Sequence, residues 1–408
     1  MSVGGRKAPI FFDKERAMDE LIVKSIFDND LYKFTMLQAV LDKCDGTPVR
    51  YVFNNRRKEG VFTPKFISAF DEQLDGMASL RVSASELDEF TKACPFFPSS
   101  FFSYLKDYRF NPNQVQLRLI DNEIEIGIEG PWQETILWEV PLLYMVSELY
   151  FKMIDTDWTF NENDQQMRLL EKALVLKDCN FADFGTRRRR NYDVQDLVVR
   201  TLMKSPGFVG TSNVHLALKH GVKPIGTMAH EWIMAMSVLK GMRHANKAAL
   251  TAWSEVFNGD LGIALTDTFG TDPFFEDFDG YLARLFDGVR QDSGDPLEFG
   301  EKAINHYNRM GIDPMTKTIV FSDSLSDKKA AQISDRFAGR IRVSFGIGTH
   351  LTNDFPGSTP LNIVIKLAEC NGVPVVKLGD DVGKAIGEKD ALRVARWIFE
   401  KRPLDAPE

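Results

Sequence analysis

A histidine next to an acid, placed where an apolar run gives way to a helix, carries the clearest chemistry in this sequence. His230 follows a strand-like run that ends at Gly226, and the apolar residues after it recur at helical spacing. This spacing predicts that His230 lies in the first turn of a helix that Thr227 caps. The positive end of a helix dipole disfavours imidazolium, so the ring is expected to be neutral and nucleophilic, at a place where phosphates bind. The alternative is a histidine that only hydrogen-bonds a neighbouring loop.

One cation and two carboxylates surround a glycine at the predicted strand end Arg290-Gln291-Asp292-Ser293-Gly294-Asp295-Pro296. Such a group can hold Mg²⁺ on a phosphorylated substrate, because Mg²⁺ prefers one or two carboxylates together with phosphate oxygens. It can also stabilise positive charge that develops on a sugar ring. A turn capped by an aspartate explains Asp295 and Pro296 but leaves Arg290 and Asp292 without a role, so this segment favours a functional site.

Two further segments are suited to binding phosphate. Four consecutive arginines, Arg187 to Arg190, follow Phe184-Gly185. Cations at a helix start oppose the helix dipole, and a bound anion compensates for them, although at most one or two of these arginines can point inward. The segment Gly346-Ile347-Gly348-Thr349 offers backbone N–H groups and a hydroxyl after a strand, which suits a phosphate but also an ordinary turn.

These segments occupy equivalent places in a repeating pattern that starts near residue 178 and runs to residue 354. Short apolar strands alternate there with amphipathic helices, as in a parallel barrel or a doubly wound sheet. The strand candidates end near Phe184, Val209, Ile225, Thr266, Arg290, Phe321 and Phe345. Each is followed by a polar, charged or glycine-containing loop. In a barrel such loops open on one face, where active sites are built, so the pattern predicts an enzyme.

The beginning and the end of the chain show a different pattern of predicted helices and strands. Helices are expected near 30–44, 65–75 and 84–92, a strand at 49–54, and an antiparallel hairpin of 115–121 with 123–129. A second hairpin, 362–369 with 373–378, is expected to join this part. We therefore predict an α+β domain of residues 1–150, joined by 355–408, and an α/β barrel domain of residues 151–354.

Composition narrows the class of protein and its setting. Of 408 residues, 44% are hydrophobic and 26% are charged, as in an ordinary globular protein, and the net charge of -8 argues against a general nucleic-acid binder. No apolar run reaches the length of a membrane span, and six histidines without HxH or HExxH spacing give no zinc signature. Four cysteines lie far apart and the N-terminus shows no signal peptide, so we expect a reduced, cytoplasmic setting.

Taken together, the segments resemble nicotinate phosphoribosyltransferase, a family of the type II phosphoribosyltransferase group, over nearly the whole chain. The resemblance rests, in the family's order, on Asp30-x-Tyr32-Lys33-x-Thr35-Met36, Phe53-Asn54-Asn55-Arg56, Phe184-Gly185-Thr186-Arg187-Arg188, Gly210-Thr211-Ser212-Asn213, Gly226-Thr227-Met228-Ala229-His230-Glu231, Arg290-x-Asp292-Ser293-Gly294-Asp295 and Gly346-x-Gly348-Thr349. It implies an irregular (β/α) barrel of the type II kind, with a second α+β domain that contains antiparallel strands.

The resemblance also implies a reaction. The family joins nicotinate to 5-phosphoribosyl 1-diphosphate, with Mg²⁺ and coupled ATP hydrolysis, and so makes nicotinate mononucleotide and diphosphate in the salvage route of NAD biosynthesis. His230 matches the histidine that ATP phosphorylates transiently, and Asp292 matches a catalytic position near the ribose and Mg²⁺. Substrate-binding positions are matched by Tyr32, Thr227 and Arg290 around nicotinate, by Phe184 on the pyridine ring, and by Arg187, Gly348 and Thr349 at the phosphates.

Tyr32 bears on the assembly and Ser212 on the choice of substrate. The spacing of Tyr32 alone favours a core position, but the resemblance implies that it reaches in from a second subunit, so a homodimer with shared active sites is expected. Related nicotinamide enzymes carry an aspartate where Ser212 stands. A carboxylate would repel nicotinate, so Ser212 favours the acid over the amide. The run of four arginines departs from the family's pattern and leaves open which of them faces a phosphate.

Two alternatives belong to other classes. A barrel of this kind can serve a phosphosugar aldolase or isomerase, or a catalytically silent relative that only binds a ligand. An aldolase needs a lysine on a central strand for a Schiff base, and the strands before residue 350 offer no convincing one. A silent relative is expected to have lost His230 or Arg290, and both are present.

Overall fold

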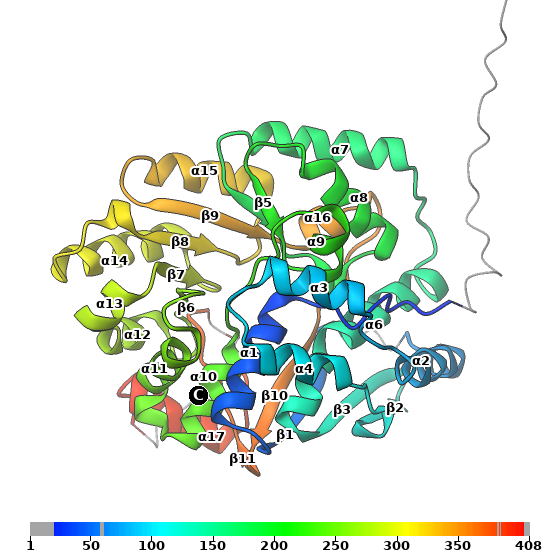
Figure 1. Cartoon of the computed structure of the whole chain (residues 1–408), viewed down its shortest axis with the longest axis horizontal. Helices are drawn as coiled ribbons and strands as arrows, with labels where there is room; N and C mark the ends of the chain where they lie inside the picture. Colours follow the sequence, from blue (N-terminus) through cyan, green and yellow to red (C-terminus); the bar gives the residue numbers. More distant parts are fainter. Residues whose placement is uncertain (1–19, 58–60, 382, 384, 404–408) are drawn as a thin grey trace, which may run out of the picture.

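The computed structural model describes residues 20–57, 61–381, 383 and 385–403, and the strands in this part form two sheets (Figure 1). The five-stranded sheet has the order β11-β10-β1-β3-β2, and the six-stranded sheet has the order β5-β4-β9-β8-β7-β6. The first contains β1 (Pro48–Asn55), β2 (Val115–Ile120), β3 (Glu123–Pro131), β10 (Ile363–Cys370) and β11 (Val373–Pro374). The second contains β4 (Phe181–Asp183), β5 (Phe208–Thr211), β6 (Ile263–Leu265), β7 (Gly288–Gln291), β8 (Thr318–Phe321) and β9 (Arg342–Ile347). The α/β class, with antiparallel strands in a separate sheet, is confirmed.

Helices separate and flank these strands. They are α1 (Leu31–Lys43), α2 (Pro64–Met77), α3 (Ala84–Ala93), α4 (Ser99–Asp107), α5 (Trp132–Thr135), α6 (Glu139–Met153), α7 (Glu162–Val175), α8 (Tyr192–Leu202), α9 (Val214–His220), α10 (His230–Leu239), α11 (Ala245–Phe257), α12 (Thr271–Asp277), α13 (Gly280–Leu285), α14 (Pro296–Arg309), α15 (Asp327–Phe337), α16 (Thr349–Thr352) and α17 (Lys389–Phe399). The helices expected near 30–44, 65–75 and 84–92 are present as α1, α2 and α3. None of the helices in the described part combines the length and apolar character that crossing a bilayer requires.

Both predicted hairpins form in the antiparallel sheet. Strands β2 and β3 pair through a turn at Asp121 and Asn122, whose φ angles of 50° and 58° are those that a tight hairpin turn demands. Strand β10 pairs with β1, so the end of the chain completes a sheet that its beginning starts. Helix α17 reaches instead to the other sheet, where Phe399 stacks on Phe269 with ring centroids 4.5 Å apart. The domain limits at residues 150 and 354 remain predictions.

All pairings in the second sheet are parallel, so the carboxyl ends of its strands meet at one edge. Its outer strands β5 and β6 are not paired with each other in the described chain, and residues 222–227 connect them instead. The N–H of Ile225 donates to the carbonyl of Thr211 over 2.8 Å, and the hydroxyl of Thr227 donates to the carbonyl of Ile263 over 3.2 Å. The barrel is therefore closed irregularly.

The strand predicted to end near Ile225 is wrong. Only an isolated bridge between Thr211 and Pro224 stands at this place. The two hydrogen bonds of this bridge join Thr211 to the residues that flank Pro224, namely the carbonyl of Lys223 and the N–H of Ile225, and the described chain shows no further bridge beyond them. The short segment that follows leads to α10, and it is therefore a connection rather than a barrel strand.

Candidate active site

A pocket of about 750 Å³ opens at the edge where the parallel strands end. The loops after β4, β7, β8 and β9 line it, together with the start of α10 and part of β10 from the other sheet. Its wall includes most of the residues that the sequence assigned to a site, namely Tyr32, Phe184, Arg187, His230, Arg290, Asp292, Gly348 and Thr349. Strands from two sheets and segments far apart in the chain thus build a single cavity.

His230 is the first residue of α10 and is almost completely buried in the wall. Its Nε2 lies 2.8 Å from Oδ1 of Asp267 and 3.7 Å from Oδ2 of Asp292. Burial, with the nearby charge of Lys377, lowers the pKa of His230 to about 4, so the ring is neutral at pH 7. Because an ionised carboxylate can only accept, Nε2 carries the proton and Nδ1 keeps its lone pair. The ring is thus neutral and stands at a helix start, as the sequence predicted, and its role as a nucleophile remains a prediction.

Thr227 does not cap this helix. The residue in the N-cap position is Ala229, which has no side chain to do so, and the hydroxyl of Thr227 donates to Ile263 instead. The capping prediction is wrong because α10 begins later than the apolar pattern suggested. The first backbone N–H groups of α10 therefore have no side-chain cap, beside the ring of His230.

Asp267 holds His230 in this tautomer, and the sequence analysis gave it no role. Its Oδ2 accepts from the hydroxyl of Ser293 over 2.6 Å and lies 2.8 Å from Nζ of Lys377. Burial alone would raise the pKa of Asp267, but His230 and Lys377 bring it well below the ordinary range, so the carboxylate is ionised. An aspartate directly after the strand candidate ending at Thr266 was the signal available in the sequence.

Asp292 stands in a second hydrogen-bonded group with Arg290 and Ser322. Its Oδ1 lies 2.9 Å from a terminal nitrogen of Arg290 and 2.7 Å from the hydroxyl of Ser322, which also accepts from Nε of Arg290 over 2.8 Å. Burial opposes ionisation, but Arg290 and His230 keep the pKa of Asp292 below its usual value. Asp295 caps α14 by accepting from the N–H groups of Leu297 and Glu298, as expected for a structural residue.

The side chains of His230, Asp267 and Asp292 bring three possible metal ligands within 4.8 Å of one another. Carboxylate oxygens suit Mg²⁺, and Asp292 has one oxygen, Oδ2, directed to this group rather than to Arg290. Oδ2 of Asp267 already has two partners, Ser293 and Lys377, so Asp292 is the better metal ligand. The residues present therefore fit the Mg²⁺ expectation.

The four consecutive arginines divide into two pairs. Arg187 and Arg188 line the pocket, and Arg188 donates to Oδ1 of Asn362 over 3.3 Å. Arg189 is fully buried and pairs with Asp28 at 2.7 Å. Arg190 is buried too, with its guanidinium 3.6 Å from the ring centroid of Phe151. Only the first pair is placed to contact a ligand, which answers the question that the sequence left open.

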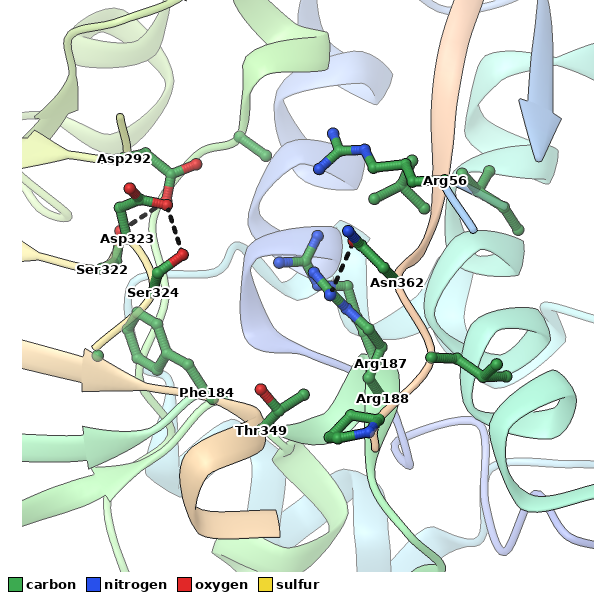
Figure 2. A pocket seen from close by; sticks show the side chains of 18 of the residues that line it. Arg56, Phe184, Arg187, Arg188, Asp292, Ser322, Asp323, Ser324, Thr349 and Asn362 are labelled. Carbon is green, nitrogen blue, oxygen red and sulfur yellow. Dashed lines mark hydrogen bonds between the residues drawn. The ribbon is translucent and has the colours of Figure 1, made fainter. Parts of the chain in front are cut away.

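Figure 2 shows two sides of the pocket with different chemistry. We call the acid side the group of His230, Asp267, Asp292 and Ser322, and the basic side the group of Arg56, Arg187, Arg188 and Lys366. Asp292 and Ser322 lie across the cavity from the labelled arginines, and the ring of Phe184 lies on the same side as Asp292, below Ser324 (Figure 2). Gly346 makes room for Phe184, because a Cβ there would lie 2.2 Å from the ring. The ring of Phe184 thus packs closely against β9 and lines the pocket.

Lys366 and Lys377 were missed by the sequence analysis. Each is a single lysine within an apolar stretch, in Ile363–Cys370 and in the residues after Val373–Pro374. Burial, together with Arg187 and Lys377, lowers the pKa of Lys366 to about 8, although Glu139 opposes the shift. A lone cation in a buried strand was the available signal, because a buried charge needs a partner or a ligand.

Two predicted site residues, Ser212 and Thr227, are not among the residues that line the pocket. The hydroxyl of Ser212 donates to Oδ1 of Asp30 over 2.7 Å, and both side chains are buried. Burial raises the pKa of Asp30, while Ser212 and Arg187 are among the groups that oppose the shift. Tyr32 lines the pocket of its own chain and need not come from a second subunit to reach it.

Comparison with known proteins agrees with this architecture. A family model described as the nicotinate phosphoribosyltransferase family matches residues 179–402, and a model of the family's N-terminal domain matches residues 27–147. The chain is similar to nicotinate phosphoribosyltransferases of Methanococcoides burtonii, with 47% identity over 94% of the chain and 99% of the relative, and of Methanosarcina mazei, with 46% identity over 94% and 100%.

Solved structures give the same result. The fold is similar to a crystal structure of nicotinate phosphoribosyltransferase from Porphyromonas gingivalis, with a TM-score of 0.89, 37% identity and coverage of 93% of this chain and 100% of that one. It is also similar to a putative nicotinate phosphoribosyltransferase from Saccharomyces cerevisiae, with a TM-score of 0.90, 36% identity and coverage of 94% and 100%. Both likenesses cover more than nine-tenths of this chain.

Proposed function

Because the chain belongs to the nicotinate phosphoribosyltransferase family, we propose that it joins nicotinate to 5-phosphoribosyl 1-diphosphate in NAD biosynthesis. The products are nicotinate mononucleotide and diphosphate. We further propose that ATP hydrolysis is coupled to this reaction through a phosphohistidine at His230, which makes the enzyme an ATP-dependent ligase. The substrates are then nicotinate, 5-phosphoribosyl 1-diphosphate and ATP, with Mg²⁺ as the metal.

The setting of His230 is the observation that carries the proposal. Its ring is neutral, its Nε2 is hydrogen-bonded to Asp267, and it begins a helix whose first N–H groups have no side-chain cap. Such a helix start attracts anions, and a neutral imidazole with a free lone pair can accept a phosphoryl group. A histidine that served only to fix a loop would not need a cavity or a carboxylate that sets its tautomer.

In the proposed phosphorylation, the lone pair on Nδ1 of His230 attacks the γ-phosphorus of ATP. The bond between that phosphorus and the bridging oxygen breaks, and ADP leaves with the electron pair. The ring gains positive charge, which Asp267 stabilises through the proton on Nε2. Attack by water later releases inorganic phosphate and restores neutral His230, so that the sum is the hydrolysis of ATP.

In the proposed glycosyl transfer, the bond between C1 of the ribose and the diphosphate oxygen breaks, and diphosphate takes the electron pair. The ring nitrogen of nicotinate forms the new bond to C1. Positive charge develops on the sugar, and the ionised carboxylate of Asp292 stabilises it, while Arg187 and Arg188 bind the leaving phosphates. Mg²⁺, when bound, would neutralise part of the diphosphate charge, with Asp292 as its main protein ligand.

Nicotinate is proposed to pack on Phe184 and to pair its carboxylate with Arg290. Both residues line the pocket, and the guanidinium of Arg290 keeps free donors beyond its contacts with Asp292 and Ser322. Ser212 contributes indirectly, because it donates to the buried Asp30 where an aspartate would add a second carboxylate. We therefore propose a preference for nicotinate over nicotinamide.

Parallel assays test this function. Product formation from nicotinate and from nicotinamide is measured with and without ATP, under matched conditions. The proposal predicts faster synthesis from nicotinate and stimulation by ATP. Equal or better use of nicotinamide would refute the substrate assignment, and a rate that is indifferent to ATP would refute the coupling.

The oligomeric state and the cellular setting stay proposals. A homodimer with shared active sites is proposed from the family resemblance, and within a single chain Tyr32 also lines the pocket. Light scattering combined with assays at high dilution tests whether sites are shared. Full activity of a monomer would exclude shared sites. A cytoplasmic setting is proposed on the four cysteines, which are all buried and unpaired.

A further inference from the structure

Glu139 is an acid in the wall of a pocket that is proposed to bind anions. It begins α6, its side chain is only 6% exposed, and it lines the cavity next to Arg187. Its Oε1 lies 3.6 Å from a terminal nitrogen of Arg187, and its Oε2 lies 2.6 Å from Nζ of Lys33. A carboxylate in this place repels a phosphate directly and partly neutralises the charge of Arg187.

Lys33 fixes Glu139 in this position. Lys33 is fully buried in α1, and its Nζ also lies 2.7 Å from Oε2 of Glu231. Burial alone would lower the pKa of Lys33, but Glu139 and Glu231 raise it, so the ammonium is charged. Burial would likewise raise the pKa of Glu139, yet Lys33, Lys366 and Arg187 lower it. Since a buried charge is stable only beside its partner, Glu139 cannot swing away when an anion enters.

Arg187 is shared between Glu139 and the cavity. The separation of 3.6 Å is too long for a hydrogen bond, and a third of the Arg187 side chain, 33%, is exposed. Its guanidinium therefore has donors available for a ligand while Glu139 still attracts it. Glu139 is paired with both Lys33 and Arg187, so drawing Arg187 toward an anion weakens its attraction to Glu139.

On the basis of the proposed function, in which Arg187 binds the diphosphate group, we propose that Glu139 is a positioning residue that weakens the binding of diphosphate by Arg187. Held by Lys33, it competes with diphosphate for Arg187. The consequence is that diphosphate, as a product, dissociates more readily than the number of cations in the wall would suggest. Removal of the charge on Glu139 should tighten binding, which is the opposite of what the loss of an ordinary structural residue does.

The test is Glu139→Gln, with the affinity for inorganic diphosphate measured by calorimetry in the presence of Mg²⁺. The expected result is a Kd lower by about fivefold, together with a lower KM for 5-phosphoribosyl 1-diphosphate. A Kd that is unchanged or higher in a folded variant overturns the proposal. If Glu139→Gln does not fold, Glu139→Asp keeps the charge but moves it away from Arg187. A lower Kd is expected there too, and an unchanged or higher one overturns the proposal.

Glu231→Gln is the matched control. Glu231 has the same burial and the same contact with Lys33 as Glu139, but the described ion pairs give it no contact with Arg187. Its Kd for diphosphate is expected to change less than about twofold, and a decrease like that of Glu139→Gln would overturn the role of Arg187. Arg187→Met separates the two levels of proposal. If it leaves the Kd unchanged, the proposed function of Arg187 fails. If it raises the Kd while Glu139→Gln has no effect, only the present inference fails.

Discussion

The acid side and the basic side of the pocket differ in how well their charges are satisfied. On the acid side, Asp267 has three partners in His230, Ser293 and Lys377, and Asp292 is paired with Arg290 and Ser322. On the basic side, like charges lie near one another. Burial, with Arg187 and Arg56, lowers the pKa of Arg188 to about 10, and that of Lys366 falls to about 8.

This difference indicates that the acid side serves the chemical steps and the basic side serves substrate binding. A closed hydrogen-bond network holds a nucleophile in one tautomer and orientation ahead of substrate binding, which suits chemistry. Cations such as Arg188 and Lys366, whose positive charge is disfavoured by burial and by neighbouring cations, are stabilised when an anion enters, which suits binding. Variants on the acid side are therefore expected to change the chemical steps, and variants on the basic side to change affinity.

The largest effect is expected for His230→Ala. Acid-labile labelling from γ-labelled ATP and ATP hydrolysis should be lost, because no other side chain on the acid side offers a neutral nitrogen nucleophile. Slow, ATP-independent formation of nucleotide should remain, since the sugar chemistry depends on Asp292 and the basic side. His220→Ala is the control, because His220 pairs with Asp196 and is not among the residues lining the pocket. Full labelling of His230→Ala would place the phosphate elsewhere.

Asp267→Asn should slow labelling of His230 by about 100-fold while binding of diphosphate changes little. The amide cannot stabilise the positive ring, and it can present a donor to Nε2, which favours the wrong tautomer. Single-turnover labelling measures this step directly. Asp323→Asn provides the comparison, since Asp323 is another acid that lines the pocket and accepts a hydrogen bond from the hydroxyl of Ser324. Equal rates in the two variants would remove Asp267 from the mechanism.

Lys366 should make diphosphate binding depend on pH. Its pKa of about 8 means that the ammonium is charged below pH 8 and is lost as pH rises through that value, so affinity should fall between pH 7 and pH 9. Lys366→Arg stays charged over this range, and comparison with it cancels the ionisation of diphosphate itself. Lys366→Met should bind about tenfold more weakly at pH 7. Identical pH profiles of the wild type and Lys366→Arg would contradict this account.

The smallest effect is expected for Ser212→Asp. Its new carboxylate would stand beside Asp30, which Ser212 now serves as a hydrogen-bond donor, and would add negative charge near the nicotinate site. The KM for nicotinate should rise by about threefold to fivefold, with labelling of His230 unchanged. Thermal unfolding, followed in parallel, separates this effect from a loss of stability. Unchanged selectivity between nicotinate and nicotinamide would show that the acid preference has another source.

The two sides also differ in how far the sequence reveals them. On the acid side, Arg290 and Asp292 stand at the end of β7, where the rule that parallel strands end at one edge correctly places them, whereas His230 reaches the same pocket through a connection that is not a strand. On the basic side, Lys366 reaches the pocket through the pairing of β10 with β1, which opposes Val52 and Lys366. No local pattern encodes a pairing between residues so far apart in the chain.

Local rules also failed where contacts with other segments decide the outcome. The apolar run before residue 226 forms only an isolated bridge at Pro224, and the hydroxyl of Thr227 donates to the carbonyl of Ile263 rather than capping α10. The arginine run shows the same limit. Its members are identical in type and adjacent, yet Asp28 draws Arg189 into the interior while Arg187 faces the cavity.

The pairing of β10 with β1 has a consequence for how the protein is made. On the ribosome, β1 emerges early and waits with an unfilled edge until β10 is synthesised, more than three hundred residues later by the register of Val49 with Cys370. Such a long-range closure is slow to form and leaves a strand edge exposed to other nascent chains. The same order means that Lys366 and Lys377 are made after the other cations that line the pocket, so the growing chain lacks part of this positive charge until β10 and β11 have been synthesised.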